Sequence, residues 1–200
     1  MTGRRVTGVV LAAGGSGRLG TPKQLLPYRD TTVLGATLDV ARDAGFDQLI
    51  VTLGGAAQAV RDAVSLDGAD VVTVDDFGTG CSASLRVALR QVHPQAAGIV
   101  LMLGDQPCVE SATLRRMVQH GPVAPAAAIM VCRYADGIGH PFWFSRAVFG
   151  ELSQLHGDKG VWKLVQSGRR PVRELGVDGP VPLDVDTWDD YRRLQESLAP

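Results

Sequence analysis

The chain contains 200 residues, of which 45% are hydrophobic and 20% are charged, as is typical of one compact folded unit and not of a disordered chain. Twenty Lys and Arg against 21 Asp and Glu give a net charge of −1, which excludes a general attraction to nucleic acid or to an anionic membrane surface. No apolar run approaches the ~18 residues of a membrane helix. A strand-like segment directly follows residues 1–5, so we expect a cytoplasmic protein.

Short apolar segments alternate with amphipathic ones in the first half of the chain. Strands rich in Val, Ile and Leu are predicted at 6–13, 48–53, 70–74 and 98–103, and helices at 32–44, 56–65 and 81–92. Near-continuous apolar strands are typical of parallel sheets that are buried on both faces. The alternation predicts a three-layer α/β/α fold, Rossmann-like and mostly parallel, with right-handed crossovers.

The second half of the chain follows a less regular pattern. Helices are predicted near 110–119, 145–154 and 159–167, strands at 126–133 and 139–144, and a closing helix after Asp186 and Thr187. We expect this half to complete the sheet and to carry a small substrate-facing subdomain. No linker rich in Ser and Gly separates the halves, so residues 1–200 are expected to form a single domain.

The three cysteines, Cys81, Cys108 and Cys132, are odd in number and lack the CxxC spacing of zinc or redox pairs. We expect three reduced, mostly buried thiols. They support no catalytic role.

A glycine-rich loop directly follows the first predicted strand. Four glycines fall within residues 14–20, where backbone N–H groups can converge on phosphate oxygens without obstruction by Cβ atoms. The loop contains a GxGxxG match, but Pro22 interrupts the helix that dinucleotide binding requires. The acidic residue at the right distance, Asp39, falls inside a helical pattern instead of at a strand end. A phosphate cradle is therefore favoured over a dinucleotide site.

Two cations, Arg18 and Lys23, flank these glycines. The chain otherwise uses arginine, with lysine elsewhere at only Lys159 and Lys163, so a lysine in this loop indicates a need for a compact point charge. The alternative is a solvated loop lysine.

Aspartates mark two further positions. Asp105 follows the strand at 98–103, and ligands in open α/β sheets bind at the carboxyl ends of strands. It is well placed to hold Mg²⁺ against a nucleotide phosphate, although a plain turn aspartate remains an alternative. Residues 183–187 are predicted as a short strand with alternate acids on one face. Asp186 is either a second metal ligand or the N-cap of the closing helix.

Several segments in chain order resemble the MobA/MocA-like nucleotidyltransferase family, which includes the molybdenum cofactor cytidylyltransferases and guanylyltransferases. They are LAAGGSGRLGTPKQLL at 11–26, GCSASLRVAL at 80–89, LGDQP at 103–107, GHPFWF at 139–144, GDKGVWKLV at 157–165 and DVDTWDDY at 184–191. The resemblance covers nearly the whole chain. Within the family, LAAG at 11–14 and TPK at 21–23 look more like the cytidylyl branch.

The resemblance implies a nucleotide-binding half at about 1–107 and an acceptor-binding half at about 108–200. The implied nucleotide-binding residues are Leu11, Ala12, Ala13, Gly14, Gly15, Ser16, Gly17, Arg18, Lys23, Gly80, Ser84 and Asp105. Among them, the implied catalytic residues are Lys23, Arg18 and Asp105. Asp105 and Asp186 are implied as ligands of Mg²⁺, or of Mn²⁺ in its place. The implied acceptor contacts are His140, Gly139, Pro141 and Asp158.

The residues themselves leave alternatives open at five positions in these segments. Ser82 and Ser84 are expected by default to cap the helix at 81–92. His140 is equally well explained as a histidine at a strand end that caps a backbone carbonyl. Trp143 and Trp162 are more typical of a core than of a ligand platform.

The reaction implied by the resemblance is transfer of CMP from CTP to the terminal phosphate of molybdopterin, with release of pyrophosphate. The partners would be these small molecules and a molybdoenzyme or chaperone client. Three alternatives stay open: a guanylyltransferase on the same cofactor, a nucleotidyltransferase for another small phosphate ester such as a sugar phosphate, and a non-catalytic carrier or chaperone.

Overall fold

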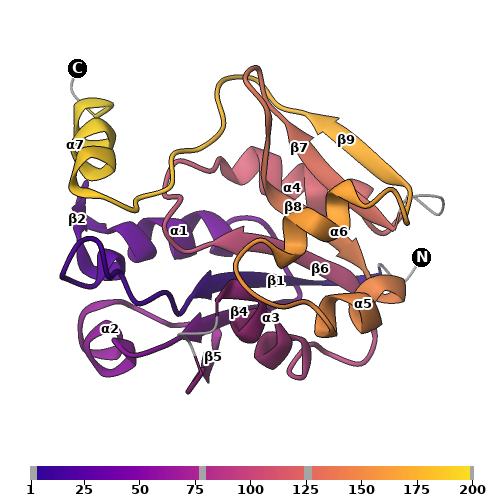
Figure 1. Cartoon of the computed structure of the whole chain (residues 1–200), viewed down its shortest axis with the longest axis horizontal. Coiled ribbons are helices and arrows are strands. Elements are labelled where there is room, and N and C mark those ends of the chain that lie inside the picture. Colours follow the sequence, from indigo (N-terminus) through magenta and orange to yellow (C-terminus); the bar gives the residue numbers. More distant parts are fainter. Residues whose placement is uncertain (1–3, 77–79, 124–127, 199–200) are drawn as a thin grey trace.

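A seven-stranded sheet forms the centre of the protein (Figure 1). This computed structural model describes residues 4–76, 80–123 and 128–198. The strands, in spatial order, are β5 (Asp70–Thr73), β4 (Gln48–Leu53), β1 (Arg5–Ala12), β6 (Ala96–Leu103), β8 (Ile138–Ser145), β7 (Ile129–Arg133) and β9 (Val172–Gly176). β8 runs antiparallel to both neighbours, and the other neighbouring strands pair in parallel. The prediction of a mostly parallel sheet is confirmed.

Helices cover both faces of this sheet because successive strand residues point to opposite sides. Val6 and Val10 of β1 pack in one apolar cluster, and Val9 and Leu11 pack in the other. The first cluster contains residues of α1 (Val33–Arg42), α2 (Ala57–Ala63) and α4 (Ser111–His120). The second contains residues of α3 (Cys81–Leu89), α5 (Phe149–Ser153) and α6 (Gly160–Gln166). The predicted three-layer α/β/α architecture is therefore confirmed.

A third, smaller apolar cluster joins the two ends of the chain. It contains Tyr28 of β2 (Pro27–Tyr28), Val33 of α1 and Leu194 of the last helix, α7 (Trp188–Glu196). β2 pairs with β3 (Thr31–Thr32) in a two-stranded hairpin. In Figure 1, α7 stands beside β2 at the left end of the molecule. The Tyr191 hydroxyl donates a hydrogen bond to the Pro27 carbonyl at 2.7 Å. This bond holds the C-terminal segment against the segment that follows β1, and the bond from the Val185 N–H to the Asp105 carbonyl holds it against the loop that follows β6.

The structure corrects several sequence predictions. The residues at 183–187 form no strand, because Val185 makes a single backbone bond, to the Asp105 carbonyl at 3.1 Å, instead of a ladder. The edge strand β9 and the hairpin of β2 and β3 were not predicted, and a 3₁₀ turn at Arg146–Val148 precedes α5. β9 is mostly exposed and therefore lacks the apolar run of a central strand. Part of the predicted strand at 126–133, residues 126–127, lies outside the described residues.

None of the helices in the described part of the chain has the length and apolar character that a membrane crossing requires. The C-terminal half completes the sheet, as predicted, by adding β7, β8 and β9 beside β6.

Candidate active site

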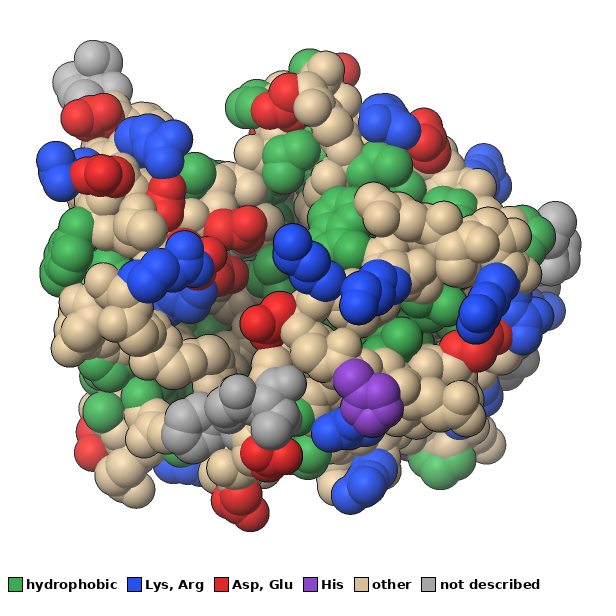
Figure 2. All heavy atoms as spheres, viewed as in Figure 1, with side chains coloured by type: hydrophobic (Ala, Val, Ile, Leu, Met, Phe, Trp, Pro, Cys, Tyr) green, Lys and Arg blue, Asp and Glu red, His purple; other side chains and the backbone are tan. Residues whose placement is uncertain are grey.

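A cavity of about 650 Å³ opens where β1 and β6 end. The chain leaves β1 toward β4 on one side and returns to β6 on the other, and such reversals in strand order create ligand crevices in α/β folds. Figure 2 shows acidic and basic side chains on both sides of a hollow in this face. All twelve predicted nucleotide-binding residues line the cavity, together with Asp158 and Asp186. The structure thus brings together residues from five separate parts of the sequence.

The glycine loop after β1 is fixed from beneath by a buried glutamine. Gln24 is 3% exposed, and its Nε2 donates hydrogen bonds to the carbonyls of Ala12 at 2.7 Å and Gly14 at 3.1 Å. The Ser16 hydroxyl accepts a bond from the backbone N–H of Lys23 at 2.9 Å. After the loop, a 3₁₀ turn at Lys23–Leu25 replaces a helix, as Pro22 predicted. Sequence reasoning missed Gln24, because a glutamine after a lysine carries no signal of its own.

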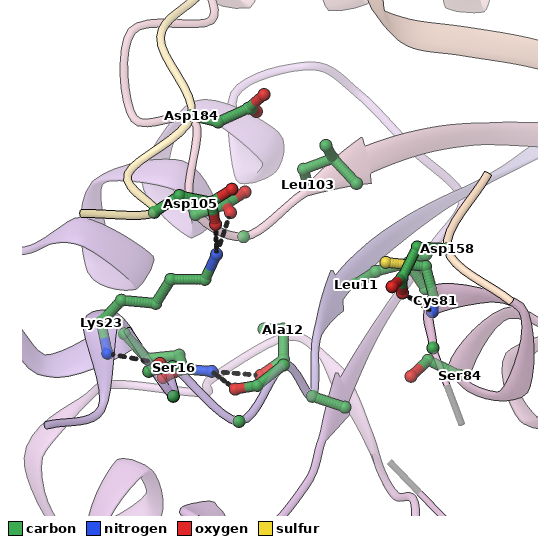
Figure 3. A pocket seen from close by; sticks show the side chains of 18 of the residues that line it. Leu11, Ala12, Ser16, Lys23, Cys81, Ser84, Leu103, Asp105, Asp158 and Asp184 are labelled. Carbon is green, nitrogen blue, oxygen red and sulfur yellow. Dashed lines mark hydrogen bonds and ion pairs between the residues drawn. The ribbon is translucent and has the colours of Figure 1, made fainter. Parts of the chain in front are cut away.

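An ionic cluster forms the wall at the carboxyl end of β6 (Figure 3). The Lys23 ammonium contacts the carboxylate of Asp105 and lies 2.8 Å from Oδ1 of Asp186. The side chains of Lys23 and Asp105 are only 15% and 14% exposed. Arg18 adds a bond of 2.7 Å to Oδ2 of Asp186. Both cations predicted to bind phosphate are therefore paired with the two aspartates predicted to bind metal.

These contacts keep the cluster charged. Burial lowers the pKa of Lys23, but the charge of Asp105 and the bonds to both aspartates outweigh it and leave that pKa raised. Burial raises the pKa of Asp186, but hydrogen bonds from Lys23 and Arg18 outweigh it and leave that pKa lowered. Ammonium and carboxylate consequently coexist as an ion pair near neutral pH.

Asp184 lies beside this cluster and also lines the cavity. Partial desolvation and the nearby charge of Asp105 raise the pKa of Asp184 to about 6. The prediction that the acids at 184 and 186 share one side is consistent with their common cavity, although no strand places them there. Asp184 itself was not singled out as a site residue.

The carboxylates of Asp105 and Asp186 suit a hard divalent cation, because both supply oxygen ligands and both converge on one point, which the Lys23 ammonium occupies. Within the described residues, no group of three or more His, Cys, Asp or Glu side chains is arranged to hold a metal ion. Mg²⁺ usually takes one or two carboxylates and fills its other positions with phosphate oxygens and water. A pair of aspartates therefore fits this kind of ion when a phosphate ligand is present.

The opposite wall is held by hydrogen bonds between side chains and the main chain. Oδ1 of Asp158 accepts the backbone N–H of Cys81 at 3.0 Å, and the Ser82 hydroxyl donates to the Gly157 carbonyl at 2.6 Å. Gly80 is the N-cap of α3, with φ of 98°. The default expectation that Ser82 or Ser84 caps this helix is wrong, because the Ser82 hydroxyl is committed to Gly157 and no side-chain cap bond is formed at Gly80.

Two further expectations are corrected near the cavity. The N-cap of α7 is Thr187, which forms a capping box with Asp190, so Asp186 does not cap that helix. Cys81 and Cys108 are exposed free thiols, and only Cys132 is buried among the three, so the expectation of mostly buried thiols is wrong. Cys81 begins α3 at the cavity edge, where there is no core to cover it. Desolvation nevertheless raises the pKa of Cys81 to about 11, which keeps it protonated.

His140 lies inside β8, and neither it nor its neighbours Gly139 and Pro141 are among the residues that line this cavity. Its ring is 6% exposed and stacks on Phe142 with centroids 4.2 Å apart. Desolvation lowers the pKa of His140 to about 4, so the ring is neutral. Trp143 is 1% exposed, in agreement with the expected core role. Contact between His140 and an acceptor stays a prediction.

Comparison of the chain with known proteins identifies its family. The family model described as MobA-like NTP transferase domain matches residues 8–172. The protein named nicotine blue oxidoreductase from Paenarthrobacter nicotinovorans is 35% identical over 196 residues, covering 94% of this chain and 96% of that relative.

Solved structures agree with the fold. The crystal structure of Rv0371c from Mycobacterium tuberculosis H37Rv is 77% identical with a TM-score of 0.93, and covers 98% of this chain and 100% of its own. A structure of Rv0371c described as a complex with manganese is 74% identical with a TM-score of 0.88, and covers 97% of this chain and 100% of its own.

Proposed function

Because this chain belongs to the MobA-like NTP transferase family, we propose that it transfers CMP from CTP to the terminal phosphate of molybdopterin and releases pyrophosphate. One observation carries the proposal: the whole predicted nucleotide set lines a single cavity in which Lys23, Asp105 and Asp186 converge. The choice of CTP rests on the LAAG and TPK segments, which resemble the cytidylyl branch. A cytoplasmic location belongs to the same proposal.

In the proposed reaction, a phosphate oxygen of the acceptor attacks the α-phosphorus of CTP in line. A new P–O bond forms while the bond to the β-phosphate breaks, and pyrophosphate carries away the negative charge. The protein acts by positioning and by stabilising charge. The loop from Ala13 to Gly17 would hold the triphosphate with its backbone N–H groups, and Arg18 and Lys23 would neutralise charge that builds between the α- and β-phosphates.

A divalent ion on Asp105 and Asp186 would neutralise phosphate oxygens when bound. The manganese complex of the 74% identical relative supports a divalent cation of this size and hardness. We propose Mg²⁺ as the ion, with Mn²⁺ able to replace it.

The acceptor side of the proposal is the half at 108–200, with contacts from Gly139, His140, Pro141 and Asp158. Asp158 supports it most directly, because it lines the cavity across from Lys23. A molybdoenzyme or chaperone client that receives the product belongs to the same proposal.

The name of one relative raises oxidoreduction as a second candidate function. Dinucleotide-binding α/β folds place an acidic residue at the end of the strand next to β1, where it binds the ribose. In this chain, β4 ends at Leu53 and is followed by Gly54 and Gly55. The site therefore favours a nucleoside triphosphate over a nicotinamide dinucleotide.

Thermal unfolding with CTP, GTP, ATP, UTP or NADPH, each with and without Mg²⁺, tests the proposal. A ligand at 100 times its Kd adds about 2.7 kcal/mol of stability, and among these ligands we expect stabilisation only for CTP, with the larger effect in the presence of Mg²⁺. Pyrophosphate release with molybdopterin as acceptor should follow. A preference for GTP would establish the guanylyltransferase alternative, and pyrophosphate release with a sugar phosphate instead of molybdopterin would establish another acceptor. Binding of the cofactor without pyrophosphate release would establish a carrier. Oxidation of NADPH would establish an oxidoreductase.

A further inference from the structure

The Lys23 ammonium stands where the two proposed metal ligands meet. It contacts Asp105 directly and lies 2.8 Å from Oδ1 of Asp186. These are the same carboxylates that a divalent ion would require. A divalent ion bound to the same oxygens would lie against the ammonium, and like charges repel strongly in a site of low exposure.

The position of Lys23 allows its ammonium to move without moving the main chain. Its backbone N–H is fixed to the Ser16 hydroxyl at 2.9 Å. Its stem runs beside the glycine loop, since a Cβ built on Gly14 would lie 3.9 Å from Cε of Lys23. Lysine carries its charge on a flexible four-carbon stem. Rotation of that stem can move the ammonium from the two carboxylates to a phosphate bound over the same glycine loop.

We propose that Lys23 is an exchangeable internal cation, which holds Asp105 and Asp186 until the triphosphate draws the ammonium away and opens the carboxylates to the divalent ion. Nucleotide and metal then bind cooperatively, and the metal alone binds weakly. The inference rests on the proposed function in one respect, that the competing anion is a nucleoside triphosphate. Arg18 holds one aspartate and is 67% exposed, so it lacks this role.

Binding of MnCl₂ without nucleotide tests the first half of the proposal, with free Mn²⁺ measured by electron paramagnetic resonance. We expect Lys23→Met to bind Mn²⁺ at least tenfold more tightly than wild type. Lys163→Met is the matched control, since Lys163 lies on α6 and does not line the cavity, and it should keep the wild-type affinity. Equal affinity of wild type and Lys23→Met would overturn the proposal.

Nuclear magnetic resonance of wild-type protein labelled with ¹³Cε-lysine tests the second half and does not depend on the folding of Lys23→Met. The chain has lysines only at 23, 159 and 163, so Lys159→Met and Lys163→Met assign the Lys23 signal by elimination. We expect CTP in EDTA to shift the Lys23 signal and leave that of Lys163 unchanged. Saturating CTP without a Lys23 shift would contradict the exchange.

The two proposals fail in different ways. If pyrophosphate is released while Mn²⁺ binds equally to wild type and Lys23→Met, the proposed function stands and the exchange does not. If no nucleotide binds, the proposed function fails, and so does the exchange with a triphosphate, whatever the Mn²⁺ affinities.

Discussion

The two walls of the cavity are held in different ways. The ionic wall, formed by Arg18, Lys23, Asp105 and Asp186, consists of side chains paired with side chains. The opposite wall includes Gly80, Cys81 and Asp158, and it is fixed by bonds that involve the main chain, one of them from the buried Ser82 behind it. A ligand can replace a side-chain partner more easily than it can break a main-chain bond. Substitutions in the ionic wall should therefore change activity with little effect on the fold, and those in the opposite wall should also change stability.

The largest effect is expected for Lys23→Ala. A single preorganised charge contact in a transition state contributes ~2.7–4 kcal/mol, so kcat should fall by about 10²-fold or more while the fold is retained. Steady-state pyrophosphate release measures this, with circular dichroism as the folding check. Lys163→Ala is the control and should match wild type. Wild-type turnover in folded Lys23→Ala would remove Lys23 from the catalytic assignment.

Gly80→Ala tests the opposite wall. Gly80 has φ of 98°, and an added Cβ would lie 2.7 Å from Oδ1 of Asp158 and 2.8 Å from its backbone nitrogen. Strain of this kind costs about 1–3 kcal/mol, and we expect the upper end from urea unfolding. Gly150→Ala, with nothing within 4 Å of its added Cβ, should not destabilise the protein. Equal unfolding midpoints for both variants would show that the opposite wall accommodates the added Cβ without loss of stability.

Gln24→Met tests whether the glycine loop depends on its buried support. The variant removes both bonds to the Ala12 and Gly14 carbonyls, and lost buried hydrogen bonds cost about 1–3 kcal/mol. We expect a loss of about 1–2 kcal/mol in unfolding free energy and weaker CTP binding in calorimetry. Gln154→Met, at an exposed position, serves as the control. Unchanged CTP affinity would mean that the loop holds its shape without Gln24.

His140, which lies outside both walls, should make a small contribution to the pH dependence of stability. Its pKa is lowered to about 4 in the folded protein, against ~6.5 when unfolded. The unfolded state thus binds more protons between these values, and stability is lost as pH falls. From pH 7.5 to 5.5 the contribution of His140 to the loss should be about 1 kcal/mol. In urea titrations, His140→Asn should remove this pH dependence of the unfolding free energy, and His156→Gln, at an exposed position, should keep it. A wild-type pH dependence in His140→Asn would assign the effect to another group.

The sequence predicted which residues form the ionic wall, but it did not predict which of them pair with one another. The glycine loop and Asp105 each follow an apolar strand directly, so local pattern was sufficient to place them at strand ends. The contact of Lys23 with Asp186 joins residues 163 positions apart and depends on α7 packing against the β2–β3 hairpin, which no local pattern reveals. The bond from Cys81 to Asp158 spans 77 positions and was hidden for the same reason.

A crystal structure of the protein with CTP and MnCl₂ tests the central claim most directly, because anomalous scattering locates the manganese. We predict one manganese on the carboxylates of Asp105 and Asp186, the triphosphate over residues 13–17, and the Lys23 ammonium turned from the aspartates to phosphate oxygens. A triphosphate bound outside this cavity, or manganese on other ligands while Lys23 still contacts both aspartates, would contradict the account.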